Sequence, residues 1–135
     1  MGTWSGEPFG NDGAADWSYV LDDAGDWGPV RAALREAIDG PLDADVAETA
    51  IAAAEVVAHG LARPTQDDAY TASVTAFVGR VGAPPGDLVA LAIAALDTAT
   101  GPDSELLDLW TDADPTEWYE ANARLDAALR GHQGD

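Results

Sequence analysis

Glu55 and His59 have the clearest potential for chemistry, because a carboxylate and an imidazole four positions apart share one face of a helix. Di-iron helical bundles use a Glu-x-x-His motif, in which the ligands are three positions apart, and they use it twice. This chain has Glu-x-x-x-His once, and its other histidine, His132, lies near the C-terminus. We therefore interpret His59 as a structural histidine near a helix end, where the helix dipole favours the charged imidazole.

Two Asp-x-Asp pairs resemble the opening of a calcium-binding EF-hand loop. Such a loop needs glycine at its sixth position and glutamate at its twelfth. The chain instead has Glu48 and Ala54 after the Asp43–Asp45 pair, and Glu117 and Ala123 after the Asp112–Asp114 pair. Both pairs are better explained as helix N-terminal caps, and we predict no metal site.

Hydrolase and phosphate-binding motifs are also missing. No serine lies in a Gly-x-Ser-x-Gly turn, and with no cysteine there is neither a thiol nucleophile nor a disulfide. The chain contains no lysine to serve a phosphate-binding loop. We therefore predict no catalytic residue and no cofactor.

The segment 9–17, Phe-Gly-Asn-Asp-Gly-Ala-Ala-Asp-Trp, is the best candidate for a specific role. Asn11, Asp12 and Asp16 fall in the first turns of an expected helix, where the helix dipole stabilises a carboxylate. They could hold a cation or a partner's arginine. The structural alternative, which we favour, is that they cap the helix while Phe9 packs onto it.

Aromatic residues gather at the two ends of the chain: eight of the ten lie before Pro29 or after Leu109. Ordering such a glycine-rich, aromatic N-terminal run is costly in entropy unless it packs against something. We predict that the two ends pack together over an alanine-rich middle. The residues expected to form a binding site there are Trp4, Phe9, Asn11, Asp12, Asp16, Trp17, Glu105 and Trp110.

The net charge restricts the classes of partner. Twenty-five acidic residues against six arginines give a formal charge of −19. This charge argues against nucleic acid, which needs a cationic surface, and against anionic membranes. It favours a basic protein partner, although a GC-rich genome or adaptation to high salt would also explain it.

Helical spacing and turn residues predict an all-α fold. No alternating strand pattern appears, and glycine and proline separate the helical segments. We expect an irregular bundle of about six or seven helices in a single domain, residues 1–135, with a non-helical N-terminal arm packed by Trp4 and Phe9. The expected helices begin at an Asn11 or Asp12 cap, Pro29, an Asp45–Glu48 capping box, Thr65–Asp68, an Asp87 cap, Ser104, and Asp114–Glu117.

Further expectations concern helix ends and burial. The first helix is expected to reach about Ala24, with Trp17, Val20 and Leu21 on one face. The 88–98 helix is apolar nearly all round and is expected to be the most buried. The last helix is expected to stop at Gly131, which leaves 131–135 as a frayed tail.

Three motifs in order carry a resemblance to a known family. The first motif, at the N-terminus, consists of Met-Gly-Thr-Trp4, Pro8-Phe9 and Asn11-Asp12-x-Ala14-x-Asp16-Trp17. The second is the run 51–55, Ile-Ala-Ala-Ala-Glu. The third consists of Ser104-Glu105-Leu106, Leu109-Trp110 and Trp118. Over nearly its whole length the chain resembles an uncharacterised bacterial family, common in actinobacteria, that is known only as a domain of unknown function. Ser5 departs from the glycine expected there, which suggests an altered N-terminal turn. The resemblance implies a bacterial, compact, cytoplasmic protein and supplies no catalytic residue.

Two hypotheses of function follow. The first is a small non-enzymatic protein that binds a basic protein partner through its acidic surface, for example as an immunity- or antitoxin-like inhibitor. The alternative is a ligand-binding module or an enzyme, with a site between the N-terminal motif and the tryptophan-rich C-terminal segment. No apolar stretch is long enough for a membrane span and no signal peptide is visible, so we expect a cytoplasmic location. Homodimerisation through the alanine-rich 46–61 helix stays open.

Overall fold

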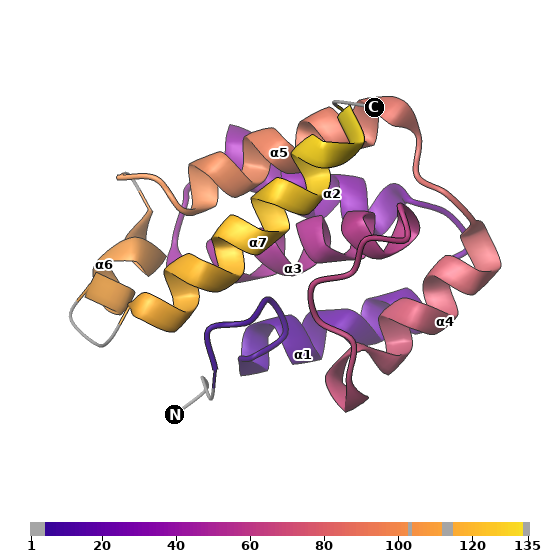
Figure 1. Ribbon diagram of the computed structural model, residues 1–135, viewed down its shortest axis with the longest axis horizontal. Helices are drawn as coiled ribbons and strands as arrows, with labels where there is room; N and C mark the ends of the chain where they lie inside the picture. The colour runs from indigo at the N-terminus through magenta and orange to yellow at the C-terminus, as the bar shows by residue number, and fades with distance from the viewer. Residues whose placement is uncertain (1–4, 103, 112–114, 134–135) are drawn as a thin grey trace.

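The chain folds into an irregular bundle of α-helices, as expected (Figure 1). The structure is a computed structural model that describes residues 5–102, 104–111 and 115–133. No β-strand occurs in these residues. The elements are α1 (Asp12–Ser18), η1 (Tyr19–Asp23, a 3₁₀ helix), α2 (Gly28–Asp39), α3 (Ala44–Gly60), η2 (Ala69–Thr71, 3₁₀), α4 (Ala72–Val81), α5 (Gly86–Ala99), α6 (Glu105–Thr111) and α7 (Thr116–Gln133).

Helix α3 forms the centre of the bundle and contacts each of the other six α-helices. Its residues 50–58 are buried without interruption, and five of these nine are alanine. Small side chains on every face let several neighbouring helices approach the same axis closely. The prediction that the 88–98 helix is the most buried was therefore wrong, because α5 exposes Ala90, Ala94 and Asp97 along one side.

The caps of α3 and α4 show how the chain starts its helices. Asp43 caps α3: its backbone is extended, and its carboxylate accepts the N–H of Val46. Asp45 already lies within the first turn, so the predicted Asp45 capping box is wrong by two positions. Asp68 begins η2 in a capping box with Thr71, and α4 continues from there.

The first helix is shorter than the sequence predicted. Asn11 caps it as expected, with its side-chain oxygen 2.8 Å from the N–H of Ala14. After Ser18 the chain tightens into η1, in which successive residues turn by about 120° rather than 100°. As a result Leu21 is buried while its neighbour Val20 is 48% exposed. The expectation that Val20 and Leu21 lie on one face with Trp17 is therefore wrong.

The N-terminal arm lies beside the start of α7 at one side of the bundle, whereas the end of α7 runs away from it (Figure 1). The backbone N–H of Gly6 donates to Glu117 Oε1 at 2.9 Å, and a methyl group on Gly6 would lie 2.5 Å from the backbone nitrogen of Trp118. The rings of Trp110 and Trp118 stack with their centroids 5.9 Å apart. Trp4, which we expected in this contact, lies outside the described residues.

Trp27 does not join this aromatic group. It packs edge-on against Phe77 of α4, with ring centroids 5.0 Å apart. Among the described residues the ring contacts therefore fall into two separate groups, Trp27 with Phe77 and Trp118 with Trp110 and Tyr119, and a single aromatic cluster is not observed.

Helix α7 closes the bundle, and its predicted buried face is confirmed. The residues on that face are Trp118, Asn122, Leu125 and Leu129. The helix does not stop at Gly131 but continues to Gln133. Gly131 therefore lies inside α7, next to the end of the Arg63 side chain, and does not terminate the helix.

Candidate functional site

The structure places the residues of the predicted site in three environments. Trp4 lies outside the described residues. Three residues are exposed: Asp12, Asp16 and Glu105. The others are buried or half-buried: Phe9, Asn11, Trp17 and Trp110. The predicted set therefore does not form one continuous surface, and only its exposed members are free to meet a macromolecular partner.

A small cavity lies where the N-terminal arm meets α3, α6 and α7. Two of the predicted residues, Asn11 and Trp110, help to line it. The complete lining is Ser5, Gly6, Glu7, Pro8, Asn11, Glu48, Ile51, Leu106, Trp110 and Trp118. The centre of a water molecule can occupy about 10 Å³ of this space, which is room for about one water. In this conformation the cavity has no room for an organic ligand.

Glu48 is one of two carboxylates on the cavity wall, with Glu7, whose pKa is raised. Its carboxylate is half-buried against the start of α1, beside Gly13. Burial raises the pKa of Glu48, and the charges of Asp45 and Asp12 raise it further. Partial burial among like charges therefore makes the ionised form of Glu48 unfavourable.

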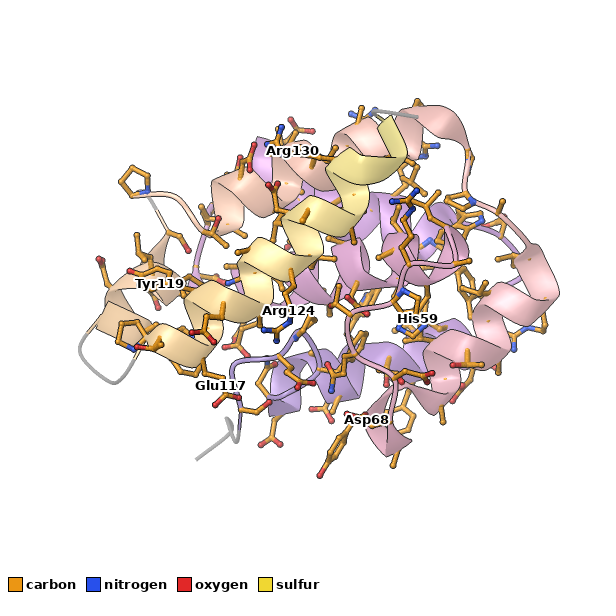
Figure 2. All side chains as sticks on the ribbon, in the orientation of Figure 1. His59, Asp68, Glu117, Tyr119, Arg124 and Arg130 are labelled. Atoms are coloured by element: carbon orange, nitrogen blue, oxygen red, sulfur yellow. The ribbon has the colours of Figure 1, made fainter. Side chains whose placement is uncertain are left out.

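Acidic groups also crowd the outer edge of the arm. Burial raises the pKa of Glu7, and the nearby Asp68 carboxylate raises it further, while the Arg124 guanidinium opposes the shift. Figure 2 shows Glu117 and Arg124 on the side of α7 that faces the arm. Arg124 therefore offsets part of the repulsion that would otherwise push the arm away from α7.

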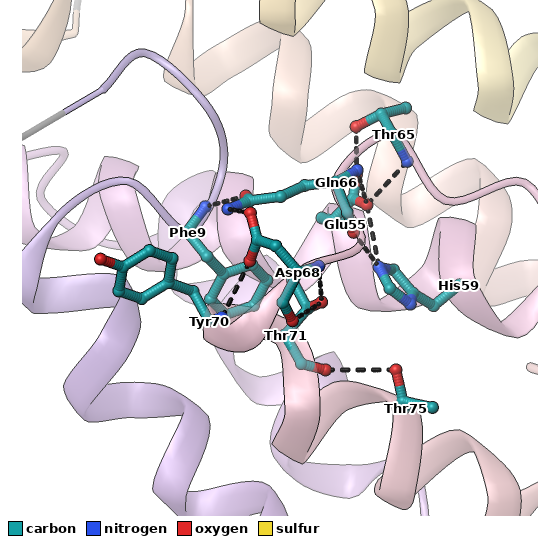
Figure 3. A network of polar contacts seen from close by, with 9 residues as sticks. All are labelled: Phe9, Glu55, His59, Thr65, Gln66, Asp68, Tyr70, Thr71 and Thr75. Carbon is teal, nitrogen blue, oxygen red and sulfur yellow. Dashed lines mark hydrogen bonds and ion pairs between the residues drawn. The ribbon is translucent and has the colours of Figure 1, made fainter.

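The Glu55–His59 pair lies at the centre of a polar network beneath the segment that joins α3 to η2 (Figure 3). Glu55 is fully buried. Its Oε2 accepts the backbone N–H groups of Thr65 and Gln66 at 2.8 and 2.9 Å, and its Oε1 accepts the Thr65 hydroxyl. His59 Nε2 lies 3.0 Å from Glu55 Oε2 and 2.8 Å from the Gln66 carbonyl oxygen. Both neighbours of Nε2 are acceptors, so this nitrogen carries a proton.

Two opposing effects act on His59. Burial by itself lowers its pKa, but the hydrogen bond to Glu55, the charge of Glu55, the Gln66 carbonyl and the charge of Asp67 together outweigh burial. The pKa of His59 is therefore raised above its ordinary value. A protonated imidazole beside a buried carboxylate forms a compensated ion pair, in keeping with a structural role.

Gln66 extends this network to the N-terminal arm. Its side-chain oxygen accepts the backbone N–H of Phe9 at 2.8 Å, and its side-chain nitrogen donates to Asp68 at 3.1 Å. Asp68 in turn caps η2. The network thus fastens the arm, the 61–68 segment and the start of α4 onto α3, which agrees with the structural interpretation of His59.

Thr65 and Gln66 are the members of this network that sequence analysis missed. The sequence suggested that Thr65 opens a helix with Asp68, whereas its N–H and hydroxyl both bind Glu55. Its partner is ten positions away along the chain, so no local pattern marks the contact. Only Pro64, which prevents α3 from continuing, indicates that the chain must turn back there.

The outer surface is acidic and poorly compensated. Several of the arginines are already engaged: Arg31 pairs with Asp87 at 2.7 Å, Arg130 pairs with Asp126 at 2.8 Å and with Asp97 at 2.9 Å. Arg80 donates to the Leu21 and Ala24 carbonyl oxygens. These cations hold helices together and leave most of the carboxylates facing solvent.

Within the described ranges, no group of three or more histidine, aspartate or glutamate side chains is placed to hold a metal ion. Among the helices of these ranges, none combines the length and the apolar character that crossing a membrane requires.

Comparisons with known proteins give one match. A family model described as a domain of unknown function (DUF4259) matches residues 2–121, so the chain belongs to this family. Neither the curated proteins nor the solved structures contain a match. The match confirms the resemblance to a family of unknown function, and it assigns no activity.

Proposed function

We propose that this member of the DUF4259 family is a small, non-enzymatic interaction protein that binds a basic protein partner through its acidic surface. The observation that carries the proposal is the uncompensated charge: a net −19 on 135 residues, with Arg31, Arg80 and Arg130 already occupied in contacts between elements. A surface of this kind attracts a cationic protein over long range and speeds its association. An immunity- or antitoxin-like inhibitor of a basic protein would fit this behaviour.

The pair of residues best suited to catalysis supports the same proposal. Glu55 and His59 are both occupied in holding the 61–68 segment, and the side chain of His59 is only 6% exposed. A general base must reach the proton that it abstracts from a substrate. In this arrangement Thr65 and Gln66 cover the carboxylate, so the pair serves the fold.

The alternative of a ligand site between the chain ends is favoured by one observation, the cavity that Asn11 and Trp110 line. With room for about one water, this cavity would have to widen before it admitted a ligand. Movement of the arm away from α7 would widen the cavity and would break the Gly6–Glu117 hydrogen bond. The acidic surface needs no such rearrangement, and it is therefore our first proposal.

Affinity capture with the tagged full chain, from a lysate of cells that produce it, tests the proposal. We expect one basic protein in stoichiometric amount at physiological salt, released when the salt concentration is raised, because added ions screen exposed charges. Titration calorimetry with the purified partner at low and high salt then measures the electrostatic share of binding. Capture of no basic protein, or of one whose affinity does not change with salt, would overturn the proposal.

A further inference from the structure

The 3₁₀ helix η1 holds two large apolar side chains out in solvent. Tyr19 is 66% exposed and Val20 48%. Their neighbour Leu21 is fully buried, and Arg80 of α4 binds the carbonyl oxygens of Leu21 and Ala24. The exposure of Tyr19 and Val20 is therefore set by a backbone that is anchored directly after them.

Carboxylates surround this apolar pair. Asp12 and Asp16 precede Tyr19 by seven and three positions, and residues at this spacing lie along one face of a helix. Asp22 and Asp23 follow Val20 by two and three positions, after the buried Leu21, and all four aspartates are exposed. In the part of the chain that the structure describes, none of them takes part in an ion pair. We call these six residues, Asp12, Asp16, Tyr19, Val20, Asp22 and Asp23, the α1–η1 face.

The α1–η1 face stands on a well-held support. Asn11 caps α1, and Ala14, Ser18 and Leu21 are buried beneath it. Helix α4 packs against η1, and α1 packs against α3 (Figure 1). Because this backbone is already ordered, binding at the face would cost little additional conformational entropy.

We infer that the α1–η1 face is the surface on which the basic partner docks. This inference rests on the proposed function and specifies its location. The partner contributes an apolar side chain that packs on Tyr19 and Val20, and arginine or lysine side chains that reach the surrounding aspartates. An exposed tyrosine with a rim of charge is a common composition for the energetic centre of an interface.

Charge complementarity selects this occupant over others. A second copy of the chain carries the same net charge of −19 and would bring the same aspartates against each other. Nucleic acid carries phosphates that the aspartates repel. A cationic protein segment with an apolar residue satisfies both parts of the face.

The test compares matched positions on the full-length chain. A photo-crosslinking residue, p-benzoylphenylalanine, replaces Tyr19 in one variant and Tyr119 in the other. Tyr119 is a suitable control because it is 47% exposed, follows the acidic α7 start, and lies on a different element. Each variant is irradiated in a lysate of the producing cells, and crosslinked proteins are identified by mass spectrometry.

Binding measurements on the partner so identified complete the test. We expect Tyr19→Ala combined with Val20→Ala to weaken binding roughly tenfold or more, and Tyr119→Ala to change it less than about twofold. Asp22→Asn combined with Asp23→Asn should slow association and reduce its dependence on salt. Circular dichroism of each variant checks that the fold is retained.

The outcomes separate the two proposals. A basic protein that crosslinks at position 19 and not at 119, and that loses affinity for the Tyr19–Val20 variant, supports the docking surface. A basic protein that binds the wild type but crosslinks only at 119, or binds the Tyr19–Val20 variant equally well, overturns the docking surface and leaves the proposed function standing. If crosslinking at both positions and affinity capture all fail to yield a basic protein, the docking surface and the proposed function are both overturned.

Discussion

Replacement of Glu55 tests whether the buried network holds the 61–68 segment on α3. In the wild type the fully buried carboxylate accepts the N–H groups of Thr65 and Gln66, the Thr65 hydroxyl and the proton of His59 Nε2. Glu55→Ala removes every one of these acceptors at once. The two backbone donors then stay buried without a partner unless the segment detaches from α3.

The expected size of the effect follows from these contacts. A buried donor left without a partner costs about 1–3 kcal/mol, and breaking a buried ion pair from one side costs about 3–5 kcal/mol. We therefore expect Glu55→Ala to lower the free energy of unfolding by about 4 kcal/mol, or about 15 °C in Tm for a chain of this length. Glu55→Gln keeps an acceptor oxygen for the two N–H groups, and the Thr65 hydroxyl can rotate to accept from the new amide, so about 1–2 kcal/mol is expected.

Denaturant unfolding at pH 7, followed by tryptophan fluorescence, measures these differences. Glu36→Ala is the matched control, because Glu36 is exposed on α2 and should change the free energy of unfolding by less than about 0.5 kcal/mol. Hydrogen exchange at the Thr65 and Gln66 amides gives a local readout, and protection there should be lost first. A Glu55→Ala variant as stable as Glu36→Ala would refute the reasoning, as would unchanged protection at these two amides.

Four further predictions concern pH, packing and salt. The pKa of His59 is raised in the folded state, so its stabilising contribution is complete below about pH 6.5 and is lost as the pH rises through the folded value. The Tm of wild type should therefore fall relative to that of His59→Gln between neutral and mildly alkaline pH. Plots of Tm against pH that run parallel for the two proteins would contradict this. Burial raises the pKa of Glu48, so Glu48→Gln should raise Tm at pH 7 by removing the buried charge. The difference in Tm between variant and wild type should shrink near pH 4, where wild-type Glu48 is protonated. A variant with a lower Tm than wild type at pH 7 would show that the charge is stabilising. Gly6→Ala would place its Cβ 2.5 Å from the Trp118 backbone nitrogen and should lower the free energy of unfolding, measured with denaturant, by about 1–3 kcal/mol. Gly79→Ala, whose Cβ would meet no atom within 4 Å, should raise it by about 0.5–1 kcal/mol. Equal effects of the two substitutions would refute the close contact of the arm with α7. Added sodium chloride should raise Tm over the range to about 1 M, because it screens repulsion within a chain of net charge −19, and a Tm that is independent of salt would show that the carboxylates are too far apart to matter.

Local sequence patterns predicted most of the helices because the physical causes are local. The Asn11 cap and the proline near the start of α2 act within one helical turn, and both are confirmed. The buried face of α7 follows from the spacing of its apolar residues, which depends only on the helical period. The net charge and the absence of cysteine are likewise properties of the sequence alone.

Helix boundaries and burial needed the tertiary structure. Asp43 and Asp45 are equally good caps by residue type, and the path of the chain entering α3 decides between them. Helices α3 and α5 are both rich in alanine and both look buried by composition. The alanines allow neighbours to approach α3 from every side, so α3 occupies the centre, an outcome that depends on all the other helices.

The features of the candidate site also fall into those that the sequence predicted and those that only the tertiary structure decided. Composition determined that the chain is acidic, and residue type made the Glu55–His59 pair visible, because both are properties of individual residues and short spacings. Only the tertiary structure brought Thr65 and Gln66 under Glu55, placed Phe9 and Asn11 in the interior, and left Tyr19 and Val20 in solvent among aspartates. Those outcomes depend on contacts between segments far apart in the chain and on the change from α to 3₁₀ geometry after Ser18, which α4 anchors through Arg80. A short stretch of sequence does not determine such contacts by itself, because they arise from the packing of the whole fold.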